Sequence, residues 1–248
     1  MIQKTTELQE QINQYWNASA SRGQAASPDG RPIKAIRPEE RQVWLQVLRP
    51  LLPPPPADVV DVGTGTGYLA FLLADLGHHV TGIDLAESML EGGRQLARER
   101  EAAGLPGQSP AFYVGDAMSP PLPPSCADVV ANRNVTWTLL DPELALRNWF
   151  ALLRPGGMLL AIHHWVMDSA GKRYADTARE ALPSLRDPAT GEAVDRFDAR
   201  WTPALLKIAQ DVGFVDLKIT EFEAVDRYDQ EQGSDHLGWL ALTGVRPS

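Results

Sequence analysis

The chain has one cysteine, Cys126, among its 248 residues. A single thiol excludes an internal disulfide and a cysteine cluster for zinc, and it is typical of a reducing compartment. No apolar stretch approaches the roughly 20 residues that cross a bilayer, and the N-terminus lacks the basic start and apolar run of a secretion signal. We therefore expect a cytoplasmic protein without a membrane partner.

Runs of lysine and arginine are also missing. The formal net charge is −9 and the sequence pI is near 5.0, so the surface as a whole repels a phosphate backbone. The sequence also lacks the His, Asp and Glu spacings of known metal sites. We expect neither a nucleic acid nor a metal as a partner, and the oligomeric state stays open.

Hydrophobic residues make up 44% of the chain, which is enough for one substantial core. From residue 57 onward, short apolar runs alternate with helical stretches, a pattern typical of βα units with a parallel sheet. We predict an α/β fold with a doubly wound, mostly parallel sheet of seven strands, helices on both faces and an N-terminal helical cap. The expected strands are 59–62, 79–84, 111–115, 128–132, 158–163, 214–220 and 237–245.

Two segments lie outside this alternating pattern. Residues 1–52 form the predicted cap, in which one helix begins at Pro38. Residues 57–248 form the predicted core, with a lid insertion at about 165–201, because a stretch of that length between elements is often a functional lid. The expected apolar walls of the closed site are Tyr15, Trp16, Tyr174 and Trp201.

The segment VVDVGTGTGYLA places Gly63, Gly65 and Gly67 between an apolar run and a helical stretch. Missing side chains let a ligand touch the backbone, and the free amides of a helix start attract an anionic group. Tight strand-to-helix turns also need glycine for structural reasons alone. Tyr68 stands where the dinucleotide fingerprint G-x-G-x-x-G has its third glycine, which disfavours a nicotinamide oxidoreductase.

Three acids accompany the ends of the first three predicted strands. Asp61 precedes the glycine segment, Asp84 ends the second strand and Asp116 follows the third. A carboxylate in the position of Asp84 can accept hydrogen bonds from both hydroxyls of a ribose. Asp116 can accept one from an exocyclic amine, beside the backbone N–H of Ala117. Each acid alone is more often a cap or turn residue, but together they indicate a nucleoside site.

The successive segments VVDVGTGTGYLA, GIDLAESML, YVGDA, DVVANRNVTWTL and LRPGGMLLAI resemble the motifs of class I S-adenosylmethionine (SAM)-dependent methyltransferases. The resemblance implies SAM as the cofactor and a small molecule that accepts the methyl group on an O, N or C nucleophile. It implies that the methionine end of SAM meets Asp61, Gly63, Thr64, Gly65, Gly67 and Arg133. It further implies that the ribose and adenine meet Asp84, Leu85, Asp116 and Ala117, and that Tyr15 contributes a contact from the cap.

In-line transfer of a methyl group depends chiefly on alignment and on exclusion of water, so a dedicated base is optional. His163 and His164 end the fifth predicted strand, at the carboxyl edge where such sheets place their chemistry. Neighbours on a strand point to opposite faces, so at most one of them is expected to face the cleft. Both are candidate catalytic bases; the alternative is that they are polar residues at the end of a strand.

Two other functions stay open. An RNA or protein methyltransferase is disfavoured by the negative net charge of the chain. It is also disfavoured by the segment NRNV, which lacks the Asn/Asp-Pro-Pro-aromatic run of adenine-amino methyltransferases. Cys126 also lies before the fourth strand, whereas a pyrimidine-attacking thiol is expected after it. A noncatalytic SAM-binding protein would keep the cofactor site without a site for an acceptor.

Overall fold

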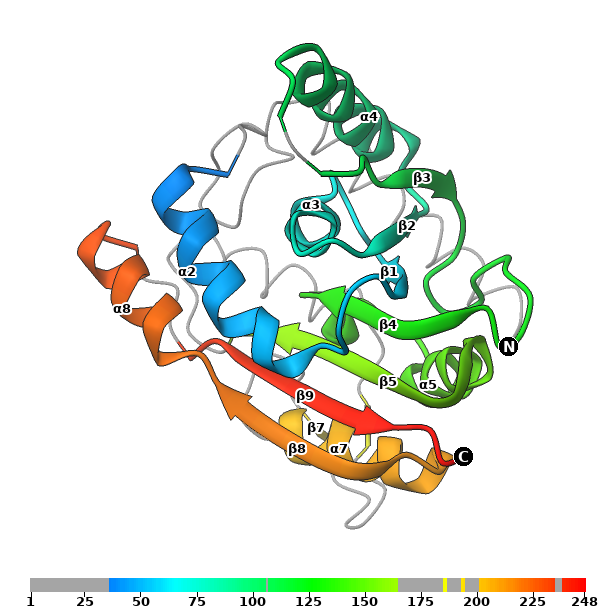
Figure 1. The fold of residues 1–248 in the computed structure, drawn as a ribbon. Coiled ribbons are helices and arrows are strands. Elements are labelled where there is room, and N and C mark those ends of the chain that lie inside the picture. The colour runs from blue at the N-terminus through cyan, green and yellow to red at the C-terminus, as the bar shows by residue number, and fades with distance from the viewer. Residues whose placement is uncertain (1–35, 106, 165–184, 187–192, 195–200, 235–237) are drawn as a thin grey trace.

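The computed structural model describes residues 36–105, 107–164, 185–186, 193–194, 201–234 and 238–248 (Figure 1). Tyr15, the other cap residues before residue 36 and most of the predicted lid lie outside these ranges.

A seven-stranded sheet forms the centre of the molecule, with the strand order β3-β2-β1-β4-β5-β9-β8. Strands β1 to β5 all run parallel to one another, whereas β9 pairs antiparallel with both β5 and β8. The predicted fold class is therefore confirmed. The strands are β1 (Asp58–Val62), β2 (His79–Asp84), β3 (Ala111–Val114), β4 (Ala127–Arg133), β5 (Leu153–His163), β8 (Val215–Glu221) and β9 (Leu240–Val245).

The strand boundaries depart from the predicted ones mainly in β5. This strand begins at Leu153 rather than at residue 158, because Leu153 pairs with Ala127 before the register shifts. Two short strands, β6 (Leu185–Arg186) and β7 (Ala193–Val194), form a separate antiparallel pair within the segment predicted as a lid.

Helices cover both faces of the sheet (Figure 1). Residues of α2, α3, α4 and α8 pack on one face, and residues of α5 and α7 pack on the other. None of the helices within the described ranges is long and apolar enough to cross a membrane. The bounds are α2 (Pro38–Leu48), η1 (Arg49–Leu51), α3 (Tyr68–Asp75), α4 (Glu87–Ala102), η2 (Thr136–Thr138), α5 (Pro142–Leu152), α7 (Trp201–Val212) and α8 (Glu223–Glu231).

The alternation of side chains along the strands produces these two layers. Val59 and Val129 belong to the cluster under α2 and α3, whereas Val60 and Val130 belong to the cluster under α5 and α7. Both faces of the inner strands are therefore apolar, as a doubly wound sheet requires. Helix α8 is absent from the sequence prediction, because among its residues only Val225 is buried and its apolar stripe is correspondingly weak.

Asp75, the last residue of α3, ties the helices of the first layer together. Its side chain is only 1% exposed. It accepts a hydrogen bond of 2.6 Å from Arg41 of α2 and another from Arg100 of α4. The guanidinium of Arg100 also lies over the ring of Phe71, 5.3 Å from its centroid. One carboxylate thus fixes three helices relative to each other.

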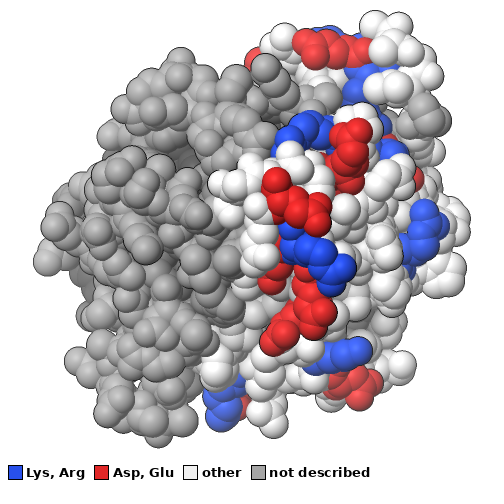
Figure 2. Space-filling model, turned by 90° about the vertical axis from the view of Figure 1, so that its left-hand side faces the viewer, with Lys and Arg blue, Asp and Glu red and all other residues white. Residues whose placement is uncertain are grey.

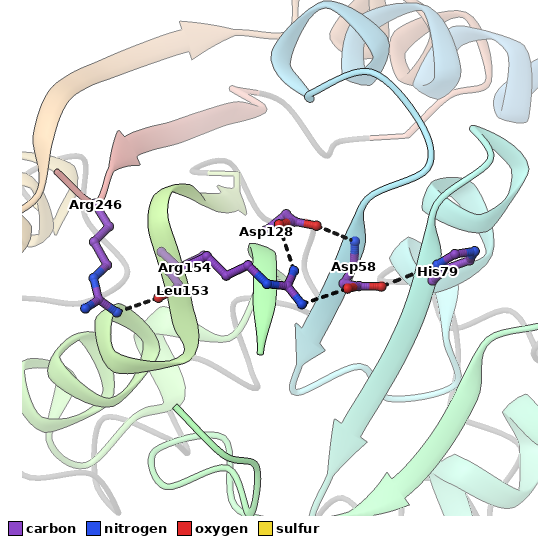
Figure 3. A network of polar contacts seen from close by, with 6 residues as sticks. All are labelled: Asp58, His79, Asp128, Leu153, Arg154 and Arg246. Atoms are coloured by element: carbon purple, nitrogen blue, oxygen red, sulfur yellow. Dashed lines mark hydrogen bonds and ion pairs between the residues drawn. The ribbon is translucent and has the colours of Figure 1, made fainter. Parts of the chain in front are cut away.

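A second ionic network joins the amino ends of four strands, at the edge of the sheet opposite the glycine segment (Figure 3). Arg154 of β5 donates to Asp58 of β1 at 2.9 Å and to Asp128 of β4 at 2.7 Å. Asp58 in turn contacts the Nδ1 atom of His79 at 3.3 Å. The side chain of Arg154 is 39% exposed, so solvent screens this network more than it screens the Asp75 cluster.

We predict that Asp75→Ala destabilises the fold by roughly 2–3 kcal/mol, because it leaves two arginines without their carboxylate. Loss of one member of a fully buried pair costs roughly 3–5 kcal/mol, and here both arginines reach solvent, which lowers the penalty. Urea unfolding followed by circular dichroism measures the change. Arg154→Gln is the matched control, for which a loss of at most about 1 kcal/mol is expected. Equal losses in the two variants would contradict the central position of Asp75.

Candidate functional site

The glycine segment forms the turn between β1 and α3, at the carboxyl edge of the sheet. Gly63, Gly65 and Gly67 all have left-handed φ values, of +67°, +57° and +86°. A Cβ atom on Gly63 would lie 2.5 Å from Val135, and one on Gly67 would lie 2.6 Å from Phe112. These two glycines are required by the packing of the protein itself.

Gly65 differs from the other two glycines of the turn. Among the described residues, no atom lies within 4 Å of a Cβ atom built on it. No described element therefore packs against the Cβ position of Gly65. Of the three glycines, it is the one whose missing side chain leaves room for a ligand in the described part of the chain.

Asp84, at the end of β2, holds this turn in place. One carboxylate oxygen accepts a hydrogen bond of 2.8 Å from the backbone N–H of Gly65, and the other accepts one of 2.9 Å from Ala86. Burial raises the pKa of this carboxyl group above its usual value. Whether or not it meets a ribose, Asp84 thus has a structural role, because its side chain cross-links the turn to β2.

Asp61 lies beneath the turn and is almost completely buried, with an exposed fraction of 1%. It accepts a hydrogen bond of 2.6 Å from the hydroxyl of Thr64. The backbone N–H of Thr64 donates in turn to the carbonyl of Ile83 in β2 at 2.9 Å. Burial raises the pKa of Asp61 from 3.8 to about 7, although the bond from Thr64 works against this shift. Its protonation therefore changes near neutral pH.

Asp116 and Ala117 form a turn of their own after β3. The Asp116 carboxylate accepts a hydrogen bond of 2.8 Å from the backbone N–H of Met118, and the Ala117 carbonyl accepts one of 2.7 Å from the indole of Trp149. Leu85 lies half-buried directly after β2. The parallel pairing of β2 with β3 places both turns at the same edge of the sheet.

Arg133, the last residue of β4, is enclosed by aromatic rings. Its guanidinium carbon lies 4.1 Å from the ring centroid of Tyr68, 4.7 Å from that of Trp239 and 5.4 Å from that of Trp44. The Tyr68 hydroxyl donates to Glu40 at 2.6 Å. The Nε atom of Arg133 is buried and has no hydrogen-bond partner among the residues that the structure describes, and burial lowers the pKa of the guanidinium.

His163 and His164 diverge at the end of β5, as the alternation of a strand requires. His163 is 1% exposed, and its Nε2 atom lies 3.2 Å from the hydroxyl of Thr202 in α7. Burial lowers the pKa of His163 to about 4, which makes it a weak proton acceptor near neutral pH. Of the two candidate bases, His163 is therefore the less suited to the role.

His164 is half-buried beside Asn134, the residue that follows Arg133. Its Nδ1 atom lies 3.2 Å from the side-chain oxygen of Asn134, and its ring lies 4.4 Å from that of Trp239. Trp239 thus contacts both His164 and Arg133. The structure brings this histidine to the side of the edge where the aromatic rings gather.

The remaining expectations about the site concern Trp201, Tyr15 and metal ions. Trp201, proposed as a wall of a closed site, is 1% exposed and packs in the cluster of α5 and α7, where its indole donates to Thr136 at 3.2 Å. It is therefore a core residue. Tyr15 lies outside the described residues. Among the residues that the structure places, no group of His, Cys, Asp and Glu is arranged to hold a metal ion.

The aromatic enclosure of Arg133 has no signature in the sequence. Trp44 lies in α2, Tyr68 begins α3 and Trp239 precedes β9, so the three rings come from distant segments. Only the tertiary packing of α2 and β9 against the end of β4 brings them together. The contact between Asn134 and His164 was likewise invisible, because the register of β4 and β5 decides it.

Comparisons with known proteins show the family to which the chain belongs. Residues 60–161 match the family described as a methyltransferase domain. The ubiquinone/menaquinone biosynthesis C-methyltransferase UbiE of Roseobacter denitrificans is 31% identical over 195 residues, which cover 71% of this chain and 74% of that protein. The malonyl-[acyl-carrier protein] O-methyltransferase of Serratia marcescens is 33% identical over 106 residues, which cover 43% of this chain but only 38% of that protein.

A solved structure shows the same fold. Phosphoethanolamine N-methyltransferase 2 of Haemonchus contortus, in complex with S-adenosyl-L-methionine, has a TM-score of 0.57 with this chain at 18% identity. The comparison covers 84% of this chain and 52% of that one.

We predict that Gly65→Ala weakens SAM binding by roughly tenfold or more, because the new methyl group enters the space left open beside the turn. Calorimetric titration with SAM measures the affinity. Gly104→Ala is the matched control, since Gly104 also has a left-handed φ, of +63°, with open space around its Cβ position. Both variants should lose about 1–2 kcal/mol of stability from the unfavourable φ. Equal SAM affinities in the two would contradict the placement of a ligand at Gly65.

Proposed function

Because the chain belongs to the class I SAM-dependent methyltransferases, we propose that it transfers the methyl group of SAM to an O, N or C nucleophile of a small molecule. The observation that carries this proposal is the backbone of Gly65, whose Cβ position no described residue fills and whose N–H is held by Asp84 at the end of β2. This edge includes the topological switch point between β1 and β4, where the strand order reverses and open α/β sheets bind their ligands.

The nucleoside half of SAM is proposed to lie along Asp84, Leu85, Asp116 and Ala117. Each carboxylate oxygen of Asp84 has a second lone pair besides the one that accepts from the backbone. The carboxylate can therefore bind ribose hydroxyls while it still holds the turn. Asp116, whose Oδ1 atom caps its own turn, offers its other oxygen to the adenine amine.

The methionine half is proposed to lie between Asp61, the glycine turn and Arg133, with Tyr15 as a further contact. This half carries an ammonium and a carboxylate group. Asp61 and Arg133 present the two opposite charges, and the unpartnered Nε of Arg133 supports a role as a hydrogen-bond donor. When bound, SAM supplies an electrophilic methyl group on a sulfonium. Gly63, Thr64 and Gly67 shape the turn around it.

The relatives' names support a small acceptor, since they refer to quinone biosynthesis and to malonyl-[acyl-carrier protein].

The distribution of surface charge also supports a small acceptor. On the face shown in Figure 2, acidic and basic side chains of the described residues are interspersed, and no broad basic patch gathers there. A nucleic acid would need such a patch. His164 is the proposed base if the acceptor has to lose a proton.

We predict that SAM affinity falls as the pH drops below about 7, by up to tenfold per pH unit, if ionised Asp61 faces the ammonium group. The reason is that the unliganded carboxyl takes up a proton in this range. Calorimetry at several pH values measures the slope. Asp61→Asn should bind SAM more weakly at pH 8 and lose the slope; a wild-type slope in this variant would contradict the assignment.

The raised pKa of Asp61 also makes the stability of the folded protein depend on pH. The folded state binds the Asp61 proton more tightly than the unfolded chain, whose pKa is near 3.8. The stability contribution of this group is therefore fully present below about pH 4 and is lost as the pH rises to about 7. Asp61→Asn should remove this loss from the pH dependence of the unliganded protein, as thermal unfolding can show.

The proposed reaction is tested by incubating the protein with SAM and each of two acceptors, reduced demethylmenaquinone and malonyl-[acyl-carrier protein]. Mass spectrometry follows S-adenosylhomocysteine and the methylated product, with Gly65→Val as the inactive control. Methylation of either acceptor supports the proposal. Tight SAM binding without transfer to either, or to pools of phenols, amines and carboxylates, would favour the noncatalytic alternative. Transfer to RNA or protein substrates only would favour the macromolecular one.

A further inference from the structure

Asn134 adopts an unusual backbone conformation at the carboxyl edge of the sheet. Its φ value is +60°, in the left-handed region that residues other than glycine rarely occupy. Asparagine enters this region more readily than most side chains do, and the conformation persists where the surroundings hold it. Its backbone N–H donates to the carbonyl of Ile162 in β5 at 2.8 Å, which supplies that restraint.

This conformation brings the Asn134 side chain to His164. Asn134 follows β4 and His164 follows β5, and these strands are paired up to Arg133 and Ile162. The side-chain oxygen of Asn134 lies 3.2 Å from Nδ1 of His164. A carbonyl oxygen only accepts hydrogen bonds, so Nδ1 must carry the proton in this contact. In the neutral ring, the other nitrogen, Nε2, then holds the lone pair.

The His164 ring is also held from the side. It packs against Trp239 at 4.4 Å with an interplanar angle of 42°. Trp239 itself is fixed by two acids of α8: Asp226 accepts from its backbone N–H at 3.1 Å, and Asp229 accepts from its indole at 2.9 Å. Arg133 also lies over this indole, so Asp226, Asp229 and Arg133 are charged groups that contact the neighbour of His164.

His163 provides the contrast. Its environment is a buried contact with the hydroxyl of Thr202, and a hydroxyl can either donate or accept. That contact therefore does not select one tautomer of His163. The contact of His164 with Asn134 differs in this respect, because the amide oxygen is confined to one hydrogen-bonding role.

From this geometry we propose that Asn134 is a positioning residue that holds His164 in the Nδ1–H tautomer and directs the basic Nε2 atom to the methyl acceptor. The inference rests on the proposed methyl transfer and adds the class of acceptor: one that must lose a proton, such as a phenol or a hydroquinone. As the nucleophile–methyl bond forms, the methyl–sulfur bond breaks and its electron pair stays on sulfur. The proton of the nucleophile passes to Nε2.

Nuclear magnetic resonance tests the tautomer without reference to activity. Long-range ¹H–¹⁵N correlation spectra of the full chain distinguish the protonated ring nitrogen from the unprotonated one, and His164→Gln assigns the signals. We expect the Nδ1–H form in the wild type and a mixture of both forms in Asn134→Gly. An Nε2–H form of His164 in the wild type would overturn the proposal.

Kinetics test the positioning role with reduced demethylmenaquinone, the acceptor of the two that has to lose a proton; transfer to the malonyl carboxylate alone would overturn the proposed acceptor class. Glycine tolerates the left-handed backbone, so Asn134→Gly removes the side chain and keeps the turn. We expect kcat to fall about 10- to 100-fold, which is less than in His164→Gln, with the SAM affinity within about twofold of wild type. Asp216→Gly is the matched control, because exposed Asp216 also has a positive φ, of +50°, and should keep wild-type kcat.

Asn134→Asp supplies a readout that a merely structural role would not change. The carboxylate still accepts from Nδ1 and also favours the charged ring, so the acid limb of the kcat profile should move to higher pH. An unmoved limb, or an unchanged kcat in Asn134→Gly, would overturn the positioning role. If the wild type methylates neither acceptor and no compound in the pools of phenols, amines and carboxylates, the proposed function is contradicted, whereas the tautomer measurement still decides the pairing of Asn134 with His164.

Discussion

The geometry of the carboxyl edge depends on the turn between β1 and α3, which has no room for side chains at Gly63 and Gly67. Val135, which follows β4, and Phe112 of β3 occupy the space that Cβ atoms would need. The turn is therefore in contact with elements on both sides of β1. Two carboxylates secure it: Asp84 through the backbone of Gly65, and Asp61 through the hydroxyl of Thr64. Every proposed cofactor contact among the described residues lies in this turn or in a segment beside it.

The rigidity of this edge is supported from a distance. Asp75 joins α2, α3 and α4, so the helix that starts at the turn is fixed to its neighbours. At the far edge of the sheet, Arg154 links the amino ends of β1, β4 and β5. Arg133 is held by aromatic stacking rather than by a carboxylate, which leaves hydrogen-bonding capacity on its Nε atom. The ion pairs that stabilise the fold thus lie apart from the charged side chains that are proposed to bind the ligand.

The end of β5 shows how strand alternation divides two similar residues between two environments. His163 enters a buried contact with α7, and burial lowers its pKa to about 4. His164 turns to the opposite side, where Asn134 and Trp239 hold its ring. The period of the strand thus places a buried packing residue next to the residue proposed as the base.

The sequence by itself determined the class of fold and predicted the outline of a cofactor site. Alternating apolar runs and helical stretches identified the seven strands, and the glycine segment with Asp61, Asp84 and Asp116 located the edge, because these signals are local and have fixed spacing. Tertiary structure alone decided which glycine faces open space, that Asp84 also braces the turn, and that Trp201 belongs to the core. It also decided that Trp44, Tyr68 and Trp239 surround Arg133. Such contacts join segments far apart in the chain, and they depend on strand register and helix packing that no local pattern encodes.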